Sequence, residues 1–392
     1  MAFHLIAALC GIVLIFATLP LALELLVLSL AAALPERPYE TSSSTSTVRL
    51  AVIIPAHNEQ QLIAPCVASL AGSATVYVIA HNCTDATAER AAAAGAEVLI
   101  LSDTVGGKGT ALDFGFRHAI AAGAQAVMVI DADSIAGPNL VSAVTSAFAS
   151  GTEALQVRYE VANSDANRRT RLAALAFLGM NVLRPLGRER LGLSCGIFGN
   201  GFALSAATLA RVPYTPNSLV EDLEYHLHLI RAGVRVQFLN HVSVFGEMPE
   251  SRAAATSQRA RWEGGRILMR RLWTRPLLLE VLRGRLRMLE PLLDLRAPPL
   301  ATEGGALVLT LILSLVAHLP WLTIYSSTGL AAIFTYLIVT TSLNDSPVKA
   351  LAALASAPAY LLFKVAMIPR TRLAARKDAA WVRTQRNAET KD

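Results

Sequence analysis

Short apolar runs and stretches with helical spacing follow one another in a regular order through the middle of the chain. Short apolar runs that end in polar residues, as buried strands do, lie at 49–55, 75–80, 96–101 and 126–134. Two stretches with helical spacing separate them, at 85–95 and 108–123, and each closes on a glycine. This β-α-β order predicts an α/β fold with a mainly parallel sheet, whose ligands gather at the carboxyl ends of the strands.

Longer apolar runs flank this middle part. Residues 5–34 exceed the roughly 20 residues that a transmembrane helix needs, and we expect one long spanning helix there. A secretory signal is the alternative, but the run lacks a basic start and is too long for one. Glu24 is costly in lipid and is expected to face protein or an interface. Further runs at 305–325, 329–343 and 350–368 predict two or three spans.

These runs divide the chain into segments. The predicted order is an N-terminal transmembrane anchor (1–36), a soluble domain (48–275), an amphipathic interfacial segment (276–303), two or three C-terminal transmembrane helices (304–370) and a basic tail (371–392). A polar linker at 41–47 joins the anchor to the soluble domain. Three C-terminal spans would export the basic tail, so two spans or a re-entrant middle segment fit the charge pattern better.

Composition and charge support a membrane protein. The chain has 53% hydrophobic and 16% charged residues and a mean hydropathy of +0.45, which is too apolar for a soluble domain. Residues 252–296 hold 11 arginines and four acidic residues, a net charge of +7. The basic stretch predicts that the soluble domain lies on the cytoplasmic side of an inner membrane. It also favours anionic lipids over nucleic acid as the partner of this stretch. The four cysteines have no metal-ligand spacing, and we expect them to be structural.

The glycine-rich stretches match neither a phosphate loop nor a dinucleotide loop. Residues 104–112 (TVGGKGTAL) lack the first glycine of a Walker loop and carry Gly109 where that loop needs Ser or Thr. Residues 199–204 (GNGFAL) lack the last glycine of the dinucleotide fingerprint. The sequence therefore supports no Rossmann cofactor.

Two aspartates follow the fourth strand, in VIDADS. Asp131 and Asp133 are spaced so that both can hold a hard divalent cation, Mg²⁺ or Mn²⁺, which in turn binds diphosphate oxygens. The alternative is an aspartate-rich turn that caps the helix beginning near Pro138.

Polar residues also follow the first two strands. Glu59 closes PAHNE after the first strand, and Asp85 stands in NCTDAT after the second. Taken alone, Glu59 is part of a turn and Asp85 is more often a helix N-cap than a ligand.

A third motif, SQRARW, places an amide, a guanidinium and an indole on one helix face. Gln258, Arg261 and Trp262 have the spacing i, i+3 and i+4. Such a face can grip a phosphate and stack on a sugar, whereas the alternative is a juxtamembrane helix with interfacial Arg and Trp.

The ordered set of motifs is more specific than any member. VIIPAHNE, NCTDAT, GGKGTALDFG, VIDADS, GNGFALS, VEDLEYHLHLIRAG and QRARW resemble the membrane-bound glycosyltransferases of family 2, such as cellulose, hyaluronan and poly-N-acetylglucosamine synthases and ceramide glucosyltransferase. The resemblance covers about residues 48–275. It implies a GT-A fold, a UDP-sugar donor, a divalent cation and inversion of the anomeric centre.

The resemblance also implies roles for individual residues. Asp222 would be the catalytic base and Asp133 the metal ligand. Substrate-binding roles would fall to Glu59 and Asp85 at the nucleoside, Lys108 near the donor phosphate or base, Asp131 at the donor, and Gln258, Arg261 and Trp262 at the diphosphate and acceptor.

Two departures bear on the product. Some polymer synthases carry Thr before the acidic pair and an FCGT-like acceptor motif, whereas this chain has Val220 and IFGNG at 197–201. The sequence therefore leaves a glycan acceptor in exopolysaccharide synthesis, with export proteins as partners, open beside a single transfer to a polyprenyl phosphate or ceramide-like lipid. A sugar-nucleotide-binding scaffold without turnover is the alternative from another class, but it has no use for a base.

The acidic pair Glu221–Asp222 is predicted to divide between two tasks. Ser218 and Glu221 have the spacing of a capping box, which gives Glu221 a structural reason. Asp222 has none, and an inverting transfer needs one base to take the proton of the acceptor hydroxyl. His226, one turn later, and His241 are predicted to be satisfied histidines rather than metal ligands.

Overall fold

The computed structural model describes residues 2–35, 48–102, 104–215, 218, 220–344, 346–376 and 386–387. The predicted linker at 41–47 and most of the basic tail lie outside these residues. The strands are β1 (Leu50–Ala56), β2 (Thr75–His81), β3 (Glu97–Leu101), β4 (Ala126–Val129), β5 (Ser134–Ala136), β6 (Ala154–Val161), β7 (Phe202–Ser205) and β8 (Val236–Gly246). The helices are α1 (Ala2–Ala32), α2 (Ile63–Ala68), α3 (Thr87–Ala93), α4 (Lys108–Ala121), α5 (Leu140–Ala149), α6 (Arg168–Leu178), α7 (Arg184–Arg190), α8 (Ala206–Arg211), α9 (Glu221–Arg231), α10 (Arg252–Leu282), α11 (Leu289–Arg296), α12 (Leu300–Val316), α13 (Pro320–Ser342), α14 (Pro347–Leu354) and α15 (Ala357–Ala374), with a π-helix at Gly179–Leu183 and a 3₁₀ turn at Leu286–Met288.

The strands form one mixed sheet in the order β3-β2-β1-β4-β7-β6-β8-β5. β3, β2, β1 and β4 run parallel, as the β-α-β pattern predicts, and β6 is parallel to β8. β7 is antiparallel to both of its neighbours, and β5 is antiparallel to β8. The predicted α/β fold with a mainly parallel sheet is therefore confirmed, with antiparallel pairs in its second half.

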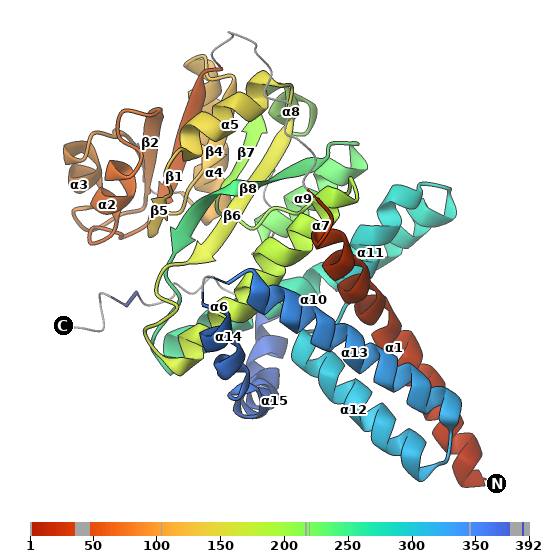
Figure 1. Ribbon diagram of the computed structural model, residues 1–392. Helices are drawn as coiled ribbons and strands as arrows, with labels where there is room; N and C mark the ends of the chain where they lie inside the picture. Colours follow the sequence, from red (N-terminus) through yellow and green to blue (C-terminus); the bar gives the residue numbers. More distant parts are fainter. Residues whose placement is uncertain are drawn as a thin grey trace.

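Helices cover both faces of this sheet (Figure 1). One core packs α2 and α5 against β1, β4 and β6, and the other packs α4, α8 and α9 against the opposite face. β1 is buried along almost its whole length, which explains its continuous apolar sequence. The carboxyl ends of β1 and β4 thus meet at one edge, where polar residues follow each strand.

Helices α1, α12 and α13 project together away from the sheet (Figure 1). Among the described residues, His4–Ala32 and Pro320–Ser342 are long and apolar enough to cross a membrane. Leu286–Arg296 and Leu300–Val316 qualify only as a pair, and they are bent by 80°. The described residues therefore contain two candidate spans, or three if the bent pair is one span.

The apolar runs near the C-terminus divide differently from the sequence prediction. The run at 305–325 is not one helix, because α12 ends at Val316 and α13 begins at Pro320. His318 between them has a left-handed φ of 48°. The run at 350–368 forms α14 and α15, which pack on α6 and α10, and neither is a candidate span.

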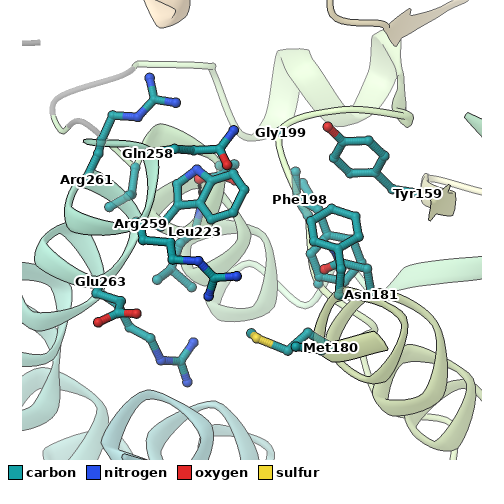
Figure 2. A pocket seen from close by; sticks show the side chains of 18 of the residues that line it. Tyr159, Met180, Asn181, Phe198, Gly199, Leu223, Gln258, Arg259, Arg261 and Glu263 are labelled. Atoms are coloured by element: carbon teal, nitrogen blue, oxygen red, sulfur yellow. Dashed lines mark hydrogen bonds between the residues drawn. The ribbon is translucent and has the colours of Figure 1, made fainter. Parts of the chain in front are cut away.

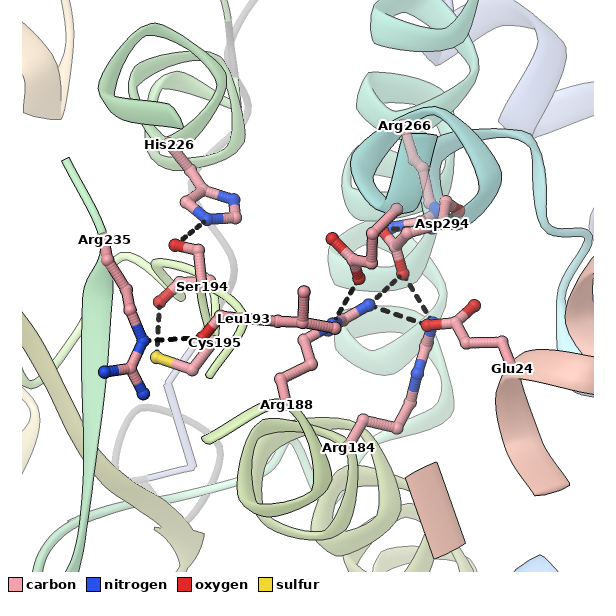
Figure 3. A network of polar contacts seen from close by, with 12 residues as sticks. Glu24, Arg184, Arg188, Leu193, Ser194, Cys195, His226, Arg235, Arg266 and Asp294 are labelled. Atoms are coloured by element: carbon pink, nitrogen blue, oxygen red, sulfur yellow. Dashed lines mark hydrogen bonds and ion pairs between the residues drawn. The ribbon is translucent and has the colours of Figure 1, made fainter. Parts of the chain in front are cut away.

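Glu24 of α1 belongs to a buried set of charges that we call the interfacial charge network (Figure 3). Its Oε1 accepts hydrogen bonds from Arg184 at 2.5 Å and from Arg188 at 2.7 Å. The network's members are Glu24, Arg184, Arg188, Arg266, Glu290 and Asp294, from α1, α7, α10 and α11. The expectation that Glu24 faces protein is confirmed, and the network joins the anchor to the soluble domain.

Replacing Glu24 should destabilise this junction. Glu24→Leu leaves Arg184 and Arg188, both over 90% buried, with one carboxylate fewer, and breaking a buried ion pair costs about 3 kcal/mol. We expect a lower midpoint of thermal unfolding for the detergent-solubilised protein. Glu24→Gln keeps an acceptor oxygen and should fall between this variant and the wild type. Equal midpoints for all three proteins would contradict the role.

Candidate active site

A cavity of about 1470 Å³ opens at the carboxyl edge of the sheet (Figure 2). Of the nine residues to which the sequence assigns roles, eight line it: Glu59, Lys108, Asp131, Asp133, Asp222, Gln258, Arg261 and Trp262. They come from five separate stretches between positions 59 and 262, so the fold gathers them from distant parts of the chain.

Lys108 connects the first aspartate of VIDADS to the loop at 196–201. Its Nζ pairs with Asp131 and donates a hydrogen bond to the Gly199 carbonyl at 2.6 Å. Burial lowers the pKa of Lys108, but Asp131 outweighs burial and holds it above the ordinary value. Lys108 is therefore a fixed cation at the centre of the cavity.

Gly199 brings this cation close to the predicted base. The residue has a left-handed φ of 75°, and a Cβ on it would lie 3.2 Å from Asp222 Oδ2 and 3.6 Å from Lys108 Nζ. Any side chain here would be strained and would crowd both groups. The glycine thus permits Asp222 and Lys108 to share one side of the cavity.

Two buried amides that the sequence analysis missed hold the same loop. Gln156 of β6 accepts a hydrogen bond from Phe198 N at 3.0 Å and donates to Asn200 O at 2.7 Å. Asn200 accepts from Asp131 N at 3.1 Å and donates to Ser134 at 2.8 Å. Both amides are fully buried, and they tie the loop to the VIDADS turn. A polar Gln in the apolar run ALQV was the available signal.

Asp222 lies in the first turn of α9. Its Oδ1 accepts a hydrogen bond from the N–H of Leu223 at 2.8 Å. Burial raises the pKa of Asp222, although that hydrogen bond and Lys108 oppose the shift. A carboxylate with a raised pKa beside an open cavity suits a general base.

Glu221 does not cap α9 together with Ser218. The N-cap is Val220, and the Ser218 hydroxyl has no hydrogen-bond partner among the described residues, so the predicted capping box is wrong. Burial and the neighbouring Asp222 raise the pKa of Glu221 to about 7. Glu221 also lines the cavity.

This raised pKa predicts how stability depends on pH. A carboxyl with a higher pKa in the folded state than its ordinary 4.5 stabilises fully below that value, and the contribution is lost as pH rises through about 7. Glu221→Gln cannot ionise, so it should match the wild type below pH 4.5 and be more stable by up to about 3 kcal/mol above pH 7. Thermal unfolding at both pH values checks this. A difference independent of pH would contradict it.

The SQRARW face lies on α10, across the cavity from Tyr159 and Phe198 (Figure 2). Burial lowers the pKa of Arg261, while Glu221 and Asp131 oppose the shift. Trp262 remains 39% exposed, with its ring 6.4 Å from that of Phe177. The indole is thus available to stack on a bound group.

Gly265 sets the distance between α10 and α9. A Cβ at this position would lie 2.2 Å from Val220, the residue before the acidic pair. Glycine inside a helix costs about 1 kcal/mol, so this close approach explains its use here. It brings the helix of Trp262 against the start of the helix of Asp222.

Asp85 and His226 are both held by hydrogen bonds to neighbouring protein groups. Asp85 does not line the cavity, and it accepts hydrogen bonds from Thr87 N at 3.0 Å and Gln60 N at 3.2 Å. His226 contacts the Ser194 hydroxyl at 2.9 Å, and burial, followed by Arg188, lowers its pKa to about 4 (Figure 3). The prediction of a satisfied histidine is confirmed for His226.

Arg386, from the C-terminal tail, reaches into the same site and was missed by the sequence analysis. Its Nη2 lies 2.6 Å from Glu59 Oε1, and its Nη1 pairs with Asp133. Asn387 beside it donates to Glu247 at 2.9 Å and accepts from Glu250 N at 2.8 Å. The basic tail therefore contributes a cation to the cavity.

Asp131 and Asp133 provide hard oxygen ligands at the edge of the sheet. Within the described residues there is no group of three or more His, Cys, Asp or Glu side chains that would hold a metal alone. The pair fits Mg²⁺ or Mn²⁺ only if a bound substrate supplies further oxygens.

The sequence of the soluble domain matches a known protein family. The family model described as "Glycosyltransferase like family 2" matches residues 48–265, more than half of the chain. The chain belongs to this glycosyltransferase family. The resemblance in motif order is confirmed at the level of the family, and the protein is an enzyme of the glycosyltransferase class. A search of curated proteins found no match.

Solved structures resemble this glycosyltransferase weakly. One is a crystal structure of a mycobacterial protein, with 22% identity over 64% of this chain and 78% of that chain and a TM-score of 0.42. Another is glucosyl-3-phosphoglycerate synthase from Mycobacterium tuberculosis with Mn²⁺, UDP and glucosyl-3-phosphoglycerate. It has 23% identity over 56% of this chain and 79% of that chain and a TM-score of 0.39. The family assignment rests on the match over residues 48–265.

Proposed function

We propose that this glycosyltransferase transfers a sugar from a UDP-sugar, with inversion, to a glycan or lipid hydroxyl at the cytoplasmic face of an inner membrane. The observation that supports this most is that Asp222 opens onto the same cavity as Asp131, Asp133 and the SQRARW face. A base, a set of donor-binding groups and an acceptor space are then adjacent. The membrane setting is supported by the candidate spans.

In this mechanism Asp222 takes the proton of the acceptor hydroxyl as the hydroxyl oxygen attacks the anomeric carbon. Lys108 and Arg261 hold the negative charge that develops on the departing diphosphate. Asp133, with Asp131, would hold a Mg²⁺ or Mn²⁺ ion, which supplies Lewis-acid stabilisation of the leaving group when bound. Trp262 would stack against the sugar and exclude water from the reacting atoms.

Acceptor class separates the alternatives. A processive polysaccharide synthase of the cellulose or hyaluronan type needs a channel. The described residues of this chain offer two or three candidate spans, and the sequence lacks the FCGT-like motif. A single transfer to a lipid needs no channel. A scaffold without turnover would bind the donor but release no UDP.

Screening UDP-sugars for UDP release by the membrane-embedded protein tests the proposal. We expect release from at least one UDP-sugar when a suitable acceptor is present, and inversion of the anomeric centre in the product. UDP binding by calorimetry without any release would favour the scaffold. Failure of both binding and release would overturn the proposed function.

Arg386 gives a further prediction about the donor. A charge-assisted hydrogen bond contributes about 1.5–3 kcal/mol, so Arg386→Gln should weaken the binding of UDP with Mn²⁺ roughly tenfold or more. Calorimetry with UDP and Mn²⁺ measures this. Arg372→Gln removes an exposed charge on α15 and serves as the control. Unchanged or tighter UDP binding in Arg386→Gln would contradict a donor-binding role.

A further inference from the structure

The cavity does not end at the reacting groups but continues to the candidate membrane spans. Its lining includes Leu21 and Leu25 of α1, Val308 of α12 and Ile333 of α13, besides Asp222 at the sheet edge. In the described part of the chain, α1 and α13 are each long and apolar enough to cross a membrane. One end of the cavity is therefore polar and holds the base, and the other is apolar and lies among membrane helices.

Space in the apolar end is left open by two glycines on α12. Gly304 and Gly305 both line the cavity. A Cβ on Gly305 would meet no atom within 4 Å, and one on Gly304 would meet only Ile333, at 3.9 Å. This part of the cavity is unfilled room rather than a packed helix contact.

The interfacial charge network lies between the two ends. Arg266 is one turn beyond Trp262 on α10, and Arg184 pairs with Glu24, which is next to Leu25 on α1. The network holds three arginines and three carboxylates that pair with one another, so it presents no excess charge to the cavity. The network therefore offers no net positive charge to hold a phosphate group, which favours a ligand with a neutral head group.

We infer that the acceptor is a lipid alcohol, with its hydroxyl at Asp222 and its hydrocarbon chain in the apolar end of the cavity. This inference rests on the proposed function and names its acceptor class. A soluble sugar would leave the apolar end without a ligand group to bury, whereas a hydrocarbon chain gains free energy for each methylene placed there.

A series of 1-monoacylglycerols with acyl chains of increasing length tests the inference. The full chain in nanodiscs is given whichever UDP-sugar releases UDP in the screen. Each buried methylene contributes about 0.8 kcal/mol to binding. The acceptor KM should therefore fall by up to about fourfold for each added methylene until the apolar end of the cavity is filled. An alkyl phosphate of matched length should be a poorer acceptor. Equal KM values at every chain length, or preference for the phosphate, would overturn the inference.

Gly305→Phe should fill the apolar end of the cavity with its side chain. It should raise the KM for long-chain acceptors about tenfold or more and remove the dependence on chain length. Leu309→Phe is the matched control, because Leu309 is on the same helix, 59% exposed and not part of the cavity lining. UDP binding by calorimetry shows that each variant is folded. Equal KM values for long-chain acceptors in the two variants would show that the hydrocarbon chain does not bind in the apolar end of the cavity. Absence of UDP binding and release in the wild type would instead refute the proposed function.

Discussion

Asp222→Asn is expected to lower the turnover number for transfer by about a thousandfold, because a positioned general base contributes roughly 10²- to 10⁴-fold. The amide keeps the size of the carboxylate and an oxygen that can accept the hydrogen bond from Leu223. The variant should therefore fold and bind UDP as the wild type does. Release of UDP from the donor, followed with a radiolabelled sugar, measures the loss.

Glu221→Gln is the matched comparison for Asp222→Asn. Both residues lie in the first turn of α9, both line the cavity, and burial raises the pKa of both. We expect Glu221→Gln to retain most of the turnover, because only one base is required. If Glu221→Gln stopped transfer and Asp222→Asn did not, the roles would be reversed. Wild-type turnover in Asp222→Asn would refute the assigned base.

The pH dependence of turnover tests the role of Asp222 independently. Since burial raises the pKa of Asp222, the ionised base is lost at a higher pH than for an exposed aspartate. Turnover in the wild type should therefore fall as the pH is lowered towards mildly acidic values. The residual turnover of Asp222→Asn should show no such acidic limb.

Sequence reasoning succeeded where the pattern is local. The strands of the first half are apolar runs closed by polar residues, and their parallel order follows from the helices between them. Glu24 is expensive in lipid, so its partners could be expected without knowing which they are. Glu59, Asp131 and Asp133 follow strands and the SQRARW residues share one helix face, so their place at the cavity could be predicted from local pattern, whereas Lys108 and Asp222 were named through the family resemblance.

Sequence reasoning did not find features that depend on the local backbone or on contacts between distant residues. Hydropathy is nearly continuous from 305 to 325, so the break between α12 and α13 shows only in Pro320 and in the backbone of His318. The nucleoside-binding role implied for Asp85 stays a prediction: Asp85 accepts hydrogen bonds from Thr87 and is not part of the cavity lining. Burial raises its pKa, but those bonds outweigh burial and hold it below the ordinary value. Arg386 lies 253 positions from Asp133, and no local pattern links the two.

Asp133→Ala is expected to reduce transfer at least about a thousandfold and to abolish the dependence of UDP binding on Mn²⁺, because stabilisation of the leaving group by a cation is worth several kcal/mol. Arg386 still has Glu59 as a partner in this variant, so the tail contact need not be lost. Asp113→Asn is the control, since Asp113 lies on α4, pairs with Arg117 and does not line the cavity. Calorimetry with UDP, with and without Mn²⁺, separates loss of the cation from loss of the fold. If Asp133→Ala bound UDP more tightly with Mn²⁺ than without it, the cation would be held elsewhere. Capping would not explain the two aspartates either, because Asn139 is the N-cap of α5, whereas Asp131 pairs with Lys108 and Asp133 with Arg386.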